Sequence, residues 1–424
     1  RWTRLDRAGV MARIILSRFR VVDYRSCKDT EITFDRKLTA LIGPNGVGKT
    51  NILQAIVLFG QPGGSISSAE DTNSQQCTVE VDFVRAKKPV RYRGTVTYRT
   101  GADNRDEALG FDERWNFVDQ NSSKSWLSID RLRASSNRSR ASLLRLARRS
   151  SLDWKQANLG GAKNLDLDAN AKRYARVADE VAEFASKITY YSASQFTNPA
   201  ASPTSFEINE RGKLSRTVNS RNLVHQKFLH DLYTASQDRI DLYDLFLSFV
   251  DKRGLGLVNG FSWRSAEFVS ETHSVASGGK VERQKKKRIL IIPTVKIGSS
   301  RLSFNQLSEG TFRTLALVFY VITNESLLLI EEPEVCVHHG LLNSVVSILK
   351  EFSRTKQIIF STHSEAVLDR LAPEQLRLVS CNQAKGTVVQ DVMSALSDEK
   401  LNSLKSYLAT AGSLGEFWRS SGFD

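Results

Sequence analysis

The sequence predicts an α/β fold: a mixed, mainly parallel sheet with an antiparallel β-subdomain, split by a mostly helical insertion. Three observations support this prediction. A glycine-rich segment at residues 43–50 lies between a strand-like and a helix-like stretch. Residues 77–84 and 90–99 alternate between polar and apolar side chains, which is the period of a half-buried antiparallel hairpin. After residue 307, helical stretches alternate with short apolar strands, a pattern typical of parallel sheets.

The N-terminal elements follow from local composition. Residues 12–22 and 30–42 are rich in Ile, Val, Leu, Phe and Thr and predict strands, and a helix is expected at 49–58. The segment AKKP joins the two strands of the expected hairpin. Residues 101–170 are polar and rich in Ser and Arg, with short helical patches such as 140–149.

The middle of the chain is expected to be mostly helical. Apolar residues recur at spacings of three and four over about two heptads, which predicts one helix but is too short to predict a long coiled coil. They are Tyr174, Val177, Val181, Phe184 and Ile188. A strand-like stretch at 190–196 (YYSASQF), a helical region at 218–252 and a loop with a basic run at 277–288 follow, before a strand at 289–297.

The C-terminal elements alternate regularly. Helices are expected at 310–324, 340–353 and 364–371, and strands at 326–331, 357–361 and 376–380. The rest of the chain is expected to be a helical tail.

The composition is that of a globular protein, because 41% of the 424 residues are hydrophobic and 25% are charged. The 4 cysteines lie far apart in the sequence, which argues against a disulfide framework or a zinc site and favours a reducing, cytoplasmic location. The longest apolar run, Leu315–Ile322, is well short of the roughly 18 residues that cross a bilayer, so no membrane association is expected. Residues 1–10 show no signal-peptide pattern, and Met11 is a candidate start.

The net charge of +14 is concentrated in two segments. Residues 124–176 contain 13 Lys and Arg against 4 Asp and Glu, a net charge of +9, and residues 280–288 contain 6 against 1, a net charge of +5. Basic patches attract nucleic acid, anionic membrane surfaces or acidic proteins. The alternative is a solvated face with a flexible loop, because a single basic run is a weak motif.

Residues 43–50 match the pattern GxxxxGK[ST] in full, in the strand–loop–helix context of a phosphate-binding P-loop. The glycines let backbone N–H groups wrap the phosphates, and the helix N-terminus adds its dipole. Lys49 is expected to reach the β- and γ-phosphates and Thr50 to ligate Mg²⁺, so ATP and Mg²⁺ are the expected cofactors. The residues expected to contact the nucleotide are Gly43, Pro44, Asn45, Gly46, Val47, Gly48, Lys49, Thr50 and Asn51.

An apolar strand at 327–330 ends in two carboxylates, Glu331 and Glu332, followed by Pro333. The strand is expected to place them at the sheet edge beside the P-loop. Glu331 is then expected to hold Mg²⁺ through water. Glu332 is expected to orient and deprotonate the attacking water, because phosphoryl transfer needs positioning more than covalent chemistry. Without a P-loop, paired glutamates after a strand are more often a surface end-cap.

Three further motifs have ordinary structural interpretations when taken alone. Leu307–Gly310 (LSEG) precedes a predicted helix, where Ser is a common N-cap and Glu favours the first turn. His363 ends a predicted strand and Gln195 follows one, and lone residues at such positions are usually structural. Gln75 and Gln76 are alternatives to Gln195.

The P-loop, LSEG, paired acids and histidine occur in an order that resembles the ABC/SMC-like ATPase superfamily, with its ABC-type ATPase head. Within it, the chain is most similar to the RecF-like and OLD-like group of AAA-type ATPases associated with phage defence. The segments that carry this resemblance are Tyr24–Ser26 (F-R-S-like), Ile42–Asn51 (IGPNGxGKTN) and Glu331–His338 (EEPE..LH). Val337 and His339 depart from the Leu and Pro of the last pattern, next to the D-loop contacts. The resemblance covers about 12–84 and 289–380.

The resemblance implies roles for the three weaker motifs. Ser308 and Gly310 resemble the signature loop, which meets the γ-phosphate bound by the other protomer. His363 resembles the switch histidine at the γ-phosphate, and Gln195 resembles the Q-loop glutamine that links the metal site to the inserted lobe. A head-to-tail homodimer, or a higher oligomer, that sandwiches two ATP molecules is implied, with Mg²⁺-dependent ATP hydrolysis as the activity. The implied catalytic residues are Lys49, Glu332 and His363, and the implied metal-binding residues are Thr50, Glu331 and Gln195.

These motifs divide the chain into four segments. They are an N-terminal ATPase half at 12–100, a basic helical insertion at 101–288 with the Q-loop-like strand near 189–196, a C-terminal ATPase half at 289–380, and a helical tail at 381–424. OLD-family nucleases carry a Toprim domain after the ATPase, and the 61 residues that follow His363 are too few to contain one. An effector is therefore expected to be a separate protein.

Four functions are compatible with the sequence. The leading hypothesis is a nucleotide-dependent dimeric switch, the sensor or regulatory ATPase of a phage-defence system with a separate effector and non-specific contacts to duplex DNA. A RecF-like ATPase of DNA repair and recombination is the alternative. A nucleotide-binding subunit of a membrane transporter is disfavoured by the large insertion, the paired acids and the basic lobe. An ATP-binding module with no role at nucleic acid stays open, because charge alone is weak evidence.

Overall fold

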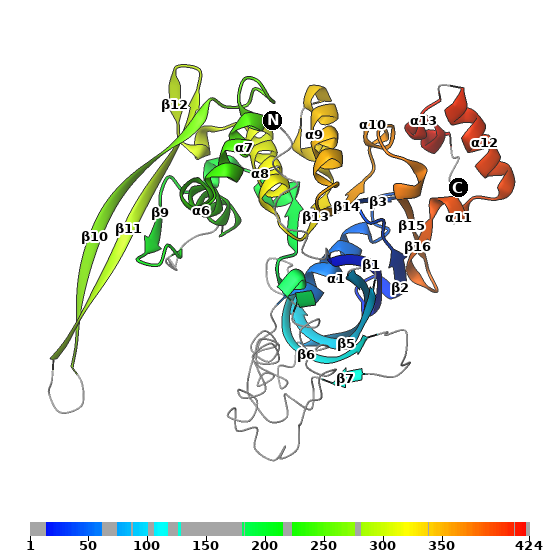
Figure 1. The fold of residues 1–424 in the computed structure, drawn as a ribbon, viewed down its shortest axis with the longest axis horizontal. Coiled ribbons are helices and arrows are strands. Elements are labelled where there is room, and N and C mark those ends of the chain that lie inside the picture. The colour runs from blue at the N-terminus through cyan, green and yellow to red at the C-terminus, as the bar shows by residue number, and fades with distance from the viewer. Residues whose placement is uncertain are drawn as a thin grey trace, which may run out of the picture. The chain divides into compact units, whose positions relative to one another are not determined.

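The computed structural model of the protein (Figure 1) describes residues 14–61, 74–85, 88–100, 106–117, 126–128, 180–181, 183–214, 223–275, 281–337, 339–410 and 412–420. The chain divides into two compact units. The first unit contains Arg1–Tyr190, Asn324–Glu331 and Ser353–Asp424, and the second contains Tyr191–Thr323 and Glu332–Phe352. The chain therefore passes between the units four times.

A twelve-stranded mixed sheet forms the first unit, in the order β7-β6-β5-β4-β1-β2-β16-β15-β3-β14-β13-β8. Its strands are β1 (Ile14–Tyr24), β2 (Cys27–Thr33), β3 (Leu38–Ile42), β4 (Gln75–Arg85), β5 (Lys88–Thr100), β6 (Asp106–Phe117), β7 (Trp126–Ser128), β8 (Thr189–Ser192), β13 (Leu327–Glu331), β14 (Gln357–Thr362), β15 (Leu376–Asn382) and β16 (Gly386–Asp391). Strand β8 begins in the first unit and ends in the second. The predicted α/β fold with a mixed sheet is confirmed.

The parallel half of the sheet aligns the ends of the strands that carry the motifs. Strand β14 pairs in parallel with β3 on one side and with β13 on the other, and β15 also pairs in parallel with β3. All of β3 is buried, as expected for a parallel strand covered on both faces. In this register Ile42 lies beside Thr362, and Glu331 lies beside Ser361. Three strands therefore end at one edge, where the glycine-rich loop begins.

Helix α1 (Lys49–Gly60) follows the glycine-rich loop and packs on both halves of the sheet. It contacts β13 and β14 of the parallel half and β1 and β6 of the antiparallel half. The ring of Phe59 lies 5.9 Å from that of Phe83 and 4.8 Å from that of Tyr92, measured between centroids. Figure 1 shows β5 and β6 curving around this helix. The predicted hairpin of β4 and β5 is confirmed, with Arg85 facing Lys88 across its turn.

Two predicted elements of the first unit differ in the structure. The expected strand at 30–42 is two strands, β2 and β3, because the side chain of Asp35 accepts hydrogen bonds from the following backbone and makes a turn. The tail at 381–424 is not wholly helical, because β16 returns antiparallel to β15 after a turn that the side chain of Asn382 stabilises. The short helices that complete the described part are α10 (Glu365–Leu368), η7 (Pro373–Gln375), α11 (Val392–Ala395), α12 (Asp398–Ala409) and α13 (Leu414–Arg419).

The second unit combines a four-stranded sheet with helices around an aromatic core. The strands are β9 (Phe206–Asn209), β10 (Gly260–Val275), β11 (Val281–Ile297) and β12 (Ser300–Leu302). The helices are η3 (Ala193–Phe196), η4 (Pro199–Ala201), α6 (Leu223–Asp238), α7 (Ile240–Val250), η5 (Phe304–Gln306), α8 (Glu309–Thr323), η6 (Pro333–Cys336) and α9 (His339–Phe352). The ring of Phe228 lies 5.6 Å from Phe312 and 5.7 Å from Phe319, both on α8. No helix in the described ranges is long and apolar enough to cross a membrane.

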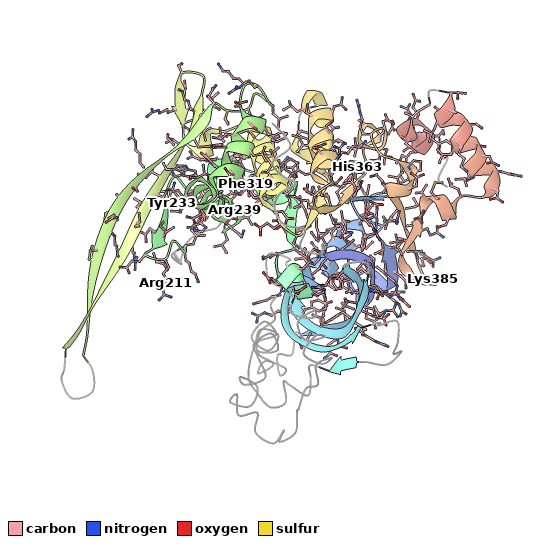
Figure 2. All side chains as sticks on the ribbon, viewed as in Figure 1. Arg211, Tyr233, Arg239, Phe319, His363 and Lys385 are labelled. Atoms are coloured by element: carbon pink, nitrogen blue, oxygen red, sulfur yellow. The ribbon has the colours of Figure 1, made fainter. Side chains whose placement is uncertain are left out.

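The helix expected at 218–252 is interrupted. Arg239, between α6 and α7, has a non-helical backbone with φ −134° and ψ 55°. Its guanidinium donates to the carbonyl of Thr323, the last residue of α8, at 3.4 Å. Arg239 and Phe319 are labelled in Figure 2. The ring of Phe319, on α8, packs edge-on against the ring of Phe246 of α7. The break therefore lets two short helices pack separately against α8.

The predicted loop at 277–288 is wrong from residue 281 onward, because this part of the basic run lies in strand β11. Strands β10 and β11 pair antiparallel from Gly260 opposite Lys296 to Val275 opposite Val281. Successive lysines hide the apolar alternation by which a strand is recognised in a sequence. The described part of the insertion is therefore not mostly helical.

Several sequence predictions fall outside the described residues. Residues 129–179 are not among them. This range contains most of the larger basic segment, the helical patch at 140–149, and Tyr174 and Val177 of the predicted helix. Val181, from the same predicted helical stripe, is described and fully buried.

Gln357 on β14 satisfies backbone groups of β1 at a place where the ladder is irregular. The register between β1 and β4 shifts between Leu16 and Arg18. The Gln357 side chain accepts from the Leu16 N–H at 3.0 Å and donates to the Leu16 carbonyl at 2.8 Å and the Asp35 carbonyl at 2.9 Å. Gln357 is 1% exposed, so water does not replace these bonds.

We expect Gln357→Leu to lower the free energy of unfolding by about 2–5 kcal/mol, because the N–H and C=O groups of Leu16 lose their partner in a buried place. Urea denaturation monitored by circular dichroism measures this change. Gln383→Leu, in the exposed turn between β15 and β16, is the control and should change the stability by less than about 0.5 kcal/mol. Equal effects of the two substitutions would contradict the role of Gln357.

Candidate nucleotide-binding site

The glycine-rich loop between β3 and α1 uses its glycines in two different ways. Gly43, Gly46 and Gly48 all have positive φ, at 151°, 81° and 105°. A Cβ atom on Gly43 would lie 2.2 Å from the carbonyl oxygen of Val379, and one on Gly48 would lie 2.1 Å from Oγ1 of Thr387. A Cβ on Gly46 would have no atom within 4 Å. Gly43 and Gly48 therefore allow close packing, whereas Gly46 borders open space.

A chain of hydrogen bonds fixes the loop to strands from both ends of the sequence. Asn51 Nδ2 donates to Ser26 Oγ at 2.7 Å, and Thr387 Oγ1 donates to the Val47 carbonyl at 2.9 Å. The Ser26 and Thr387 hydroxyls are 2.7 Å apart. Because Thr387 gives its proton to Val47, Ser26 is the donor between the two hydroxyls. Thr387, on β16, was not predicted as a site residue. Asn51, which was predicted to contact the nucleotide, donates a hydrogen bond to Ser26.

The turn before Ser26 is held against α1 by a small polar cluster. Arg25 has φ 50° and donates to Gln54 Oε1 on α1 at 2.5 Å. Its guanidinium also lies 3.1 Å from Asp106 Oδ2, which accepts a hydrogen bond from the Tyr24 hydroxyl. Burial, together with this bond to Asp106, raises the pKa of Tyr24 far above its ordinary value. The segment Tyr24–Ser26 therefore orients the beginning of α1.

The first residues of α1 point back to the loop and across to β13. Lys49 is 6% exposed, and its ammonium donates to the carbonyls of Gly43 at 2.7 Å and Pro44 at 2.8 Å. Thr50 Oγ1 donates to Glu331 Oε1. The structure thus brings the loop lysine, the loop threonine and the first strand-end carboxylate to one place in the first unit.

Glu331 has a second partner that the sequence analysis missed. Its Oε2 atom accepts a hydrogen bond from the Tyr190 hydroxyl at 2.6 Å. Beside Glu331 in the ladder lies Ser361, which is 1% exposed and whose hydroxyl has no hydrogen-bond partner. The only signal in the sequence was the position of Tyr190 in YYSASQF, five residues before Gln195.

His363 belongs to the same edge of the sheet. It follows Thr362, which pairs with Ile42 directly before the glycine-rich loop. His363 is exposed and is labelled in Figure 2. The register therefore brings the end of β14, the start of the loop and Glu331 to neighbouring positions.

The other predicted site residues lie in the second unit. Glu332 has φ 46° and is the N-cap residue before η6, and the boundary between the units falls between Glu331 and Glu332. Ser308 Oγ accepts from the Thr311 N–H at 3.3 Å, so it caps α8, and both Ser308 and Gly310 are exposed. Gln195 is half-buried in η3.

The ring of Phe196, the residue after Gln195, stacks on the ring of His225 with centroids 5.9 Å apart. Burial lowers the pKa of His225, whose ring packs edge-on against Phe312 of α8 with centroids 4.8 Å apart. Within the second unit, the segment of Gln195 is thus connected through His225 to the helix that follows Ser308.

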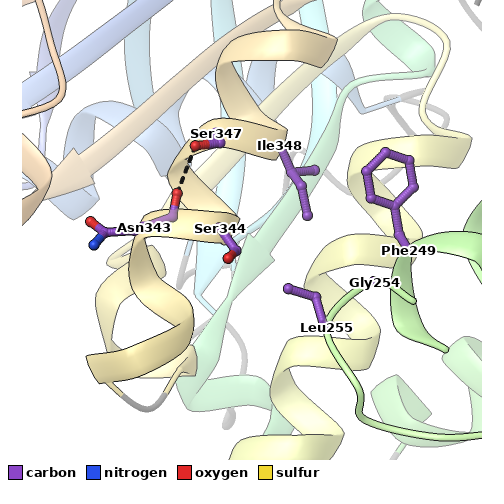
Figure 3. Close-up of a pocket in the computed structure, with 7 residues that line it drawn as sticks. All are labelled: Phe249, Gly254, Leu255, Asn343, Ser344, Ser347 and Ile348. Carbon is purple, nitrogen blue, oxygen red and sulfur yellow. Dashed lines mark hydrogen bonds between the residues drawn. The ribbon is translucent and has the colours of Figure 1, made fainter. Parts of the chain in front are cut away.

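A cavity in the second unit does not have the chemistry of a phosphate site. It has a volume of about 380 Å³ and lies between the end of α7 and helix α9 (Figure 3). Its lining residues are Phe249, Gly254, Leu255, Asn343, Ser344, Ser347 and Ile348. None of these side chains is charged, and Ser347 donates within its own helix to the Asn343 carbonyl at 2.8 Å.

The residues around Glu331 fit a Mg²⁺–phosphate group. The hydroxyl of Thr50, the carboxylate of Glu331 and the unpartnered hydroxyl of Ser361 are hard oxygen donors, which Mg²⁺ prefers. Among the described residues no cluster of three or more His, Cys, Asp or Glu could hold a metal by itself. Mg²⁺ usually binds through one or two protein oxygens with the substrate phosphates, so the sparse oxygen set at this edge is of the expected kind.

Residues 38–369 match the protein-family model described as "AAA domain, putative AbiEii toxin, Type IV TA system". The chain belongs to this family. The matched region of this AAA domain runs from β3 to α10 and includes the glycine-rich loop, both glutamates and His363. The predicted P-loop ATPase domain is confirmed at the level of the family.

Individual relatives match over shorter stretches or at lower similarity. The DNA replication and repair protein RecF of Rickettsia typhi is 39% identical over 77 residues, which is 18% of this chain and 21% of that protein. RecF of Rickettsia conorii is 44% identical over 76 residues, with the same coverage. The chain thus spans about a fifth of the length of these relatives.

Two solved structures cover most of the chain. The SMC head domain from Thermotoga maritima covers 89% of this chain and 99% of its own, with 16% identity and a TM-score of 0.40. An SMC head bound to the C-winged helix domain of ScpA covers 91% and 98%, with 15% identity and a TM-score of 0.44.

Two loop glycines of the AAA domain should respond differently to the same substitution. Gly46→Ala and Gly48→Ala both force an L-residue into positive φ, but only the second drives a Cβ into Thr387. We expect Gly48→Ala to destabilise the protein by at least about 1 kcal/mol more than Gly46→Ala, because overpacking adds to the backbone strain. Urea denaturation of both variants measures the difference. Equal stabilities would show that Thr387 does not fix the loop.

Proposed function

We propose that this chain binds ATP with Mg²⁺ at the glycine-rich loop and hydrolyses it. The observation that carries the proposal is the hydrogen bond from Thr50 to Glu331, which are 281 residues apart in the sequence. A hydroxyl from the P-loop helix and a carboxylate from a strand end meet at the edge where the backbone at Gly46 borders open space. This combination is the machinery of phosphoryl transfer in P-loop proteins.

Each residue of the site has a step that it can perform. Lys49 exchanges its bonds to the loop carbonyls for bonds to phosphate oxygens, which its ammonium neutralises. Thr50 and Glu331 hold the Mg²⁺ ion, which when bound neutralises the charge that develops on the phosphates. Glu332 orients the attacking water and takes its proton, and His363 contacts the γ-phosphate.

The proposed active form is a head-to-tail dimer. Ser308 and Gly310 are exposed at the start of α8, and a Cβ on Gly310 would have no atom within 4 Å. This surface can approach a phosphate bound by a second protomer, with the α8 N-terminus aimed at the negative charge. ATP then favours the closed dimer and hydrolysis releases it, because only the closed state has contacts to both protomers.

For the biological setting we propose a sensor or regulatory ATPase of a phage-defence system, which acts on a separate effector protein. The family description, which names a putative toxin, supports this setting. A second candidate is a RecF-like ATPase of DNA repair, supported by the short matches at 39% and 44% identity. ATP-dependent binding to gapped duplex DNA without a toxic partner would favour the repair function. A nuclease gene beside this one would favour defence.

The β10–β11 hairpin is the described surface best suited to non-specific DNA contact. Strand β9 pairs with β11 only from Arg288 to Ile291, so residues 281–287 of β11 pair with β10 alone. This two-stranded ribbon contains most of the basic run, and β-ribbons of this kind enter DNA grooves. Phe268 and Val269, facing Arg288 and Lys287 in the register, are 55% and 62% exposed.

Glu332→Gln should keep ATP binding but lower the hydrolysis rate by on the order of 10²–10⁴, because the amide cannot accept the proton of the attacking water. The variant should also accumulate as a dimer with ATP. Phosphate release and light scattering measure the two effects. Lys49→Ala, which removes a phosphate contact, is the control and should bind no ATP. A normal hydrolysis rate for Glu332→Gln would refute its role as the base.

Lys285→Glu combined with Lys286→Glu should weaken duplex DNA binding by on the order of tenfold at low salt and flatten its salt dependence, because two phosphate contacts are lost. Fluorescence anisotropy with one duplex at several salt concentrations measures this effect. Lys385→Glu combined with Lys405→Glu changes the charge equally at exposed positions of the first unit and is the matched control. Equal losses for both pairs, or wild-type binding that ignores salt, would contradict DNA contact through the hairpin.

A further inference from the structure

The hydrogen bond from Tyr190 to Glu331 gives the metal-binding carboxylate a partner that the motifs do not contain. We propose that Tyr190 is a positioning residue, which holds the Glu331 carboxylate in the orientation that binds Mg²⁺. This inference rests on the proposed function, because it concerns the same ATP site. Tyr190 does not touch the nucleotide in this account and acts through Glu331.

The two oxygens of Glu331 are held from two different elements. Thr50 on α1 donates to Oε1, and Tyr190 on β8 donates to Oε2 at 2.6 Å. That distance is typical of a hydroxyl donating to a charged carboxylate, which is one of the stronger hydrogen bonds in proteins. Strand β13, which ends in Glu331, lies between β14 and β8 in the sheet, so Tyr190 reaches Glu331 from the neighbouring strand. With both oxygens bonded, the carboxylate cannot rotate freely.

Both bonds are compatible with metal binding. A hydroxyl has one proton and two lone pairs, so Thr50 can give its proton to Glu331 and still offer a lone pair to Mg²⁺. Tyr190 contributes a proton in the same way and leaves the remaining lone pairs of Glu331 available. Partners that orient metal ligands typically contribute a factor of about 10–100 in metal affinity. The expected contribution of Tyr190 is of this size.

The position of Tyr190 in the chain adds a second reason for its role. Tyr190 and Glu331 are each the last residue of the first unit before the chain enters the second. Their hydrogen bond therefore joins, within the first unit, two positions at which the chain passes from this unit to the second. The adjacent Tyr191 has a different environment, because its hydroxyl donates to the Arg313 carbonyl at 2.9 Å and its ring stacks on Phe196.

Neighbouring tyrosines with different partners provide a matched test. Tyr190→Phe removes only the hydroxyl and keeps the ring, which packs against the core of the first unit. Tyr191→Phe makes the same chemical change one residue later. Mn²⁺ replaces Mg²⁺ as the probe, and its binding to each variant with saturating ATP is measured by electron paramagnetic resonance. A fluorescent ATP analogue in EDTA measures nucleotide binding without metal, and thermal unfolding measures stability.

We expect Tyr190→Phe to weaken Mn²⁺ binding by about tenfold, with metal-free nucleotide binding unchanged, and Tyr191→Phe to bind Mn²⁺ as the wild type does. In a Glu331→Gln background, Tyr190→Phe should have little further effect, because the carboxylate that it positions is gone.

Three outcomes would overturn the inference. In the first, Tyr190→Phe binds Mn²⁺ as tightly as the wild type. In the second, the substitution weakens metal-free nucleotide binding by the same factor as Mn²⁺ binding. In the third, it lowers Mn²⁺ affinity as much in the Glu331→Gln background as in the wild type. A different failure identifies the proposed function itself as wrong. If the wild-type chain binds neither the ATP analogue nor Mn²⁺ with ATP, the site does not take Mg²⁺–ATP, and the role of Tyr190 falls with it.

Discussion

The parallel register of β3, β14 and β13 is the constraint on which the candidate site depends. It places Ile42 beside Thr362 and Glu331 beside Ser361, so the glycine-rich loop and the first acid emerge at one edge. A shift of any of these strands by one residue would turn its side chains to the opposite face. The hydrogen bond from Thr50 to Glu331 is a direct result of this alignment. Loop glycines, lysine and carboxylate therefore form a site only because three buried strands end together.

The sequence predicted the parts of the site that depend on local pattern. The P-loop and the apolar strand before Glu331 were found because spacing and alternation define them within a few residues. Tyr190 and Thr387 were missed because their role comes from pairing between distant segments. Thr387 meets Ser26 across 361 residues of sequence, and nothing near Thr387 indicates this contact. The first part of β11, residues 281–288, was predicted as a loop because its lysines show no apolar alternation.

The second unit is built around a closely packed set of aromatic side chains. Its aromatic core packs Phe228 and Phe246 against α8, the helix that begins after Ser308. The ring of His225 packs between Phe312 of this helix and Phe196, the residue after Gln195. A displacement of the segment that contains Gln195, or of the N-terminus of α8, would be transmitted through these packed rings. Close-packed cores shift between discrete arrangements and do not deform continuously. Glu331 and Glu332 are consecutive residues on opposite sides of the boundary between the units.

The central claim is that the edge defined by β3, β14 and β13 is a Mg²⁺–ATP site. Isothermal titration calorimetry of the wild-type chain with ATP, in the presence of Mg²⁺ and in EDTA, tests it most directly. The account predicts saturable binding that Mg²⁺ tightens, because Thr50 and Glu331 add metal contacts to those of the loop. An absence of binding in Mg²⁺, or an affinity that Mg²⁺ leaves unchanged, would contradict it.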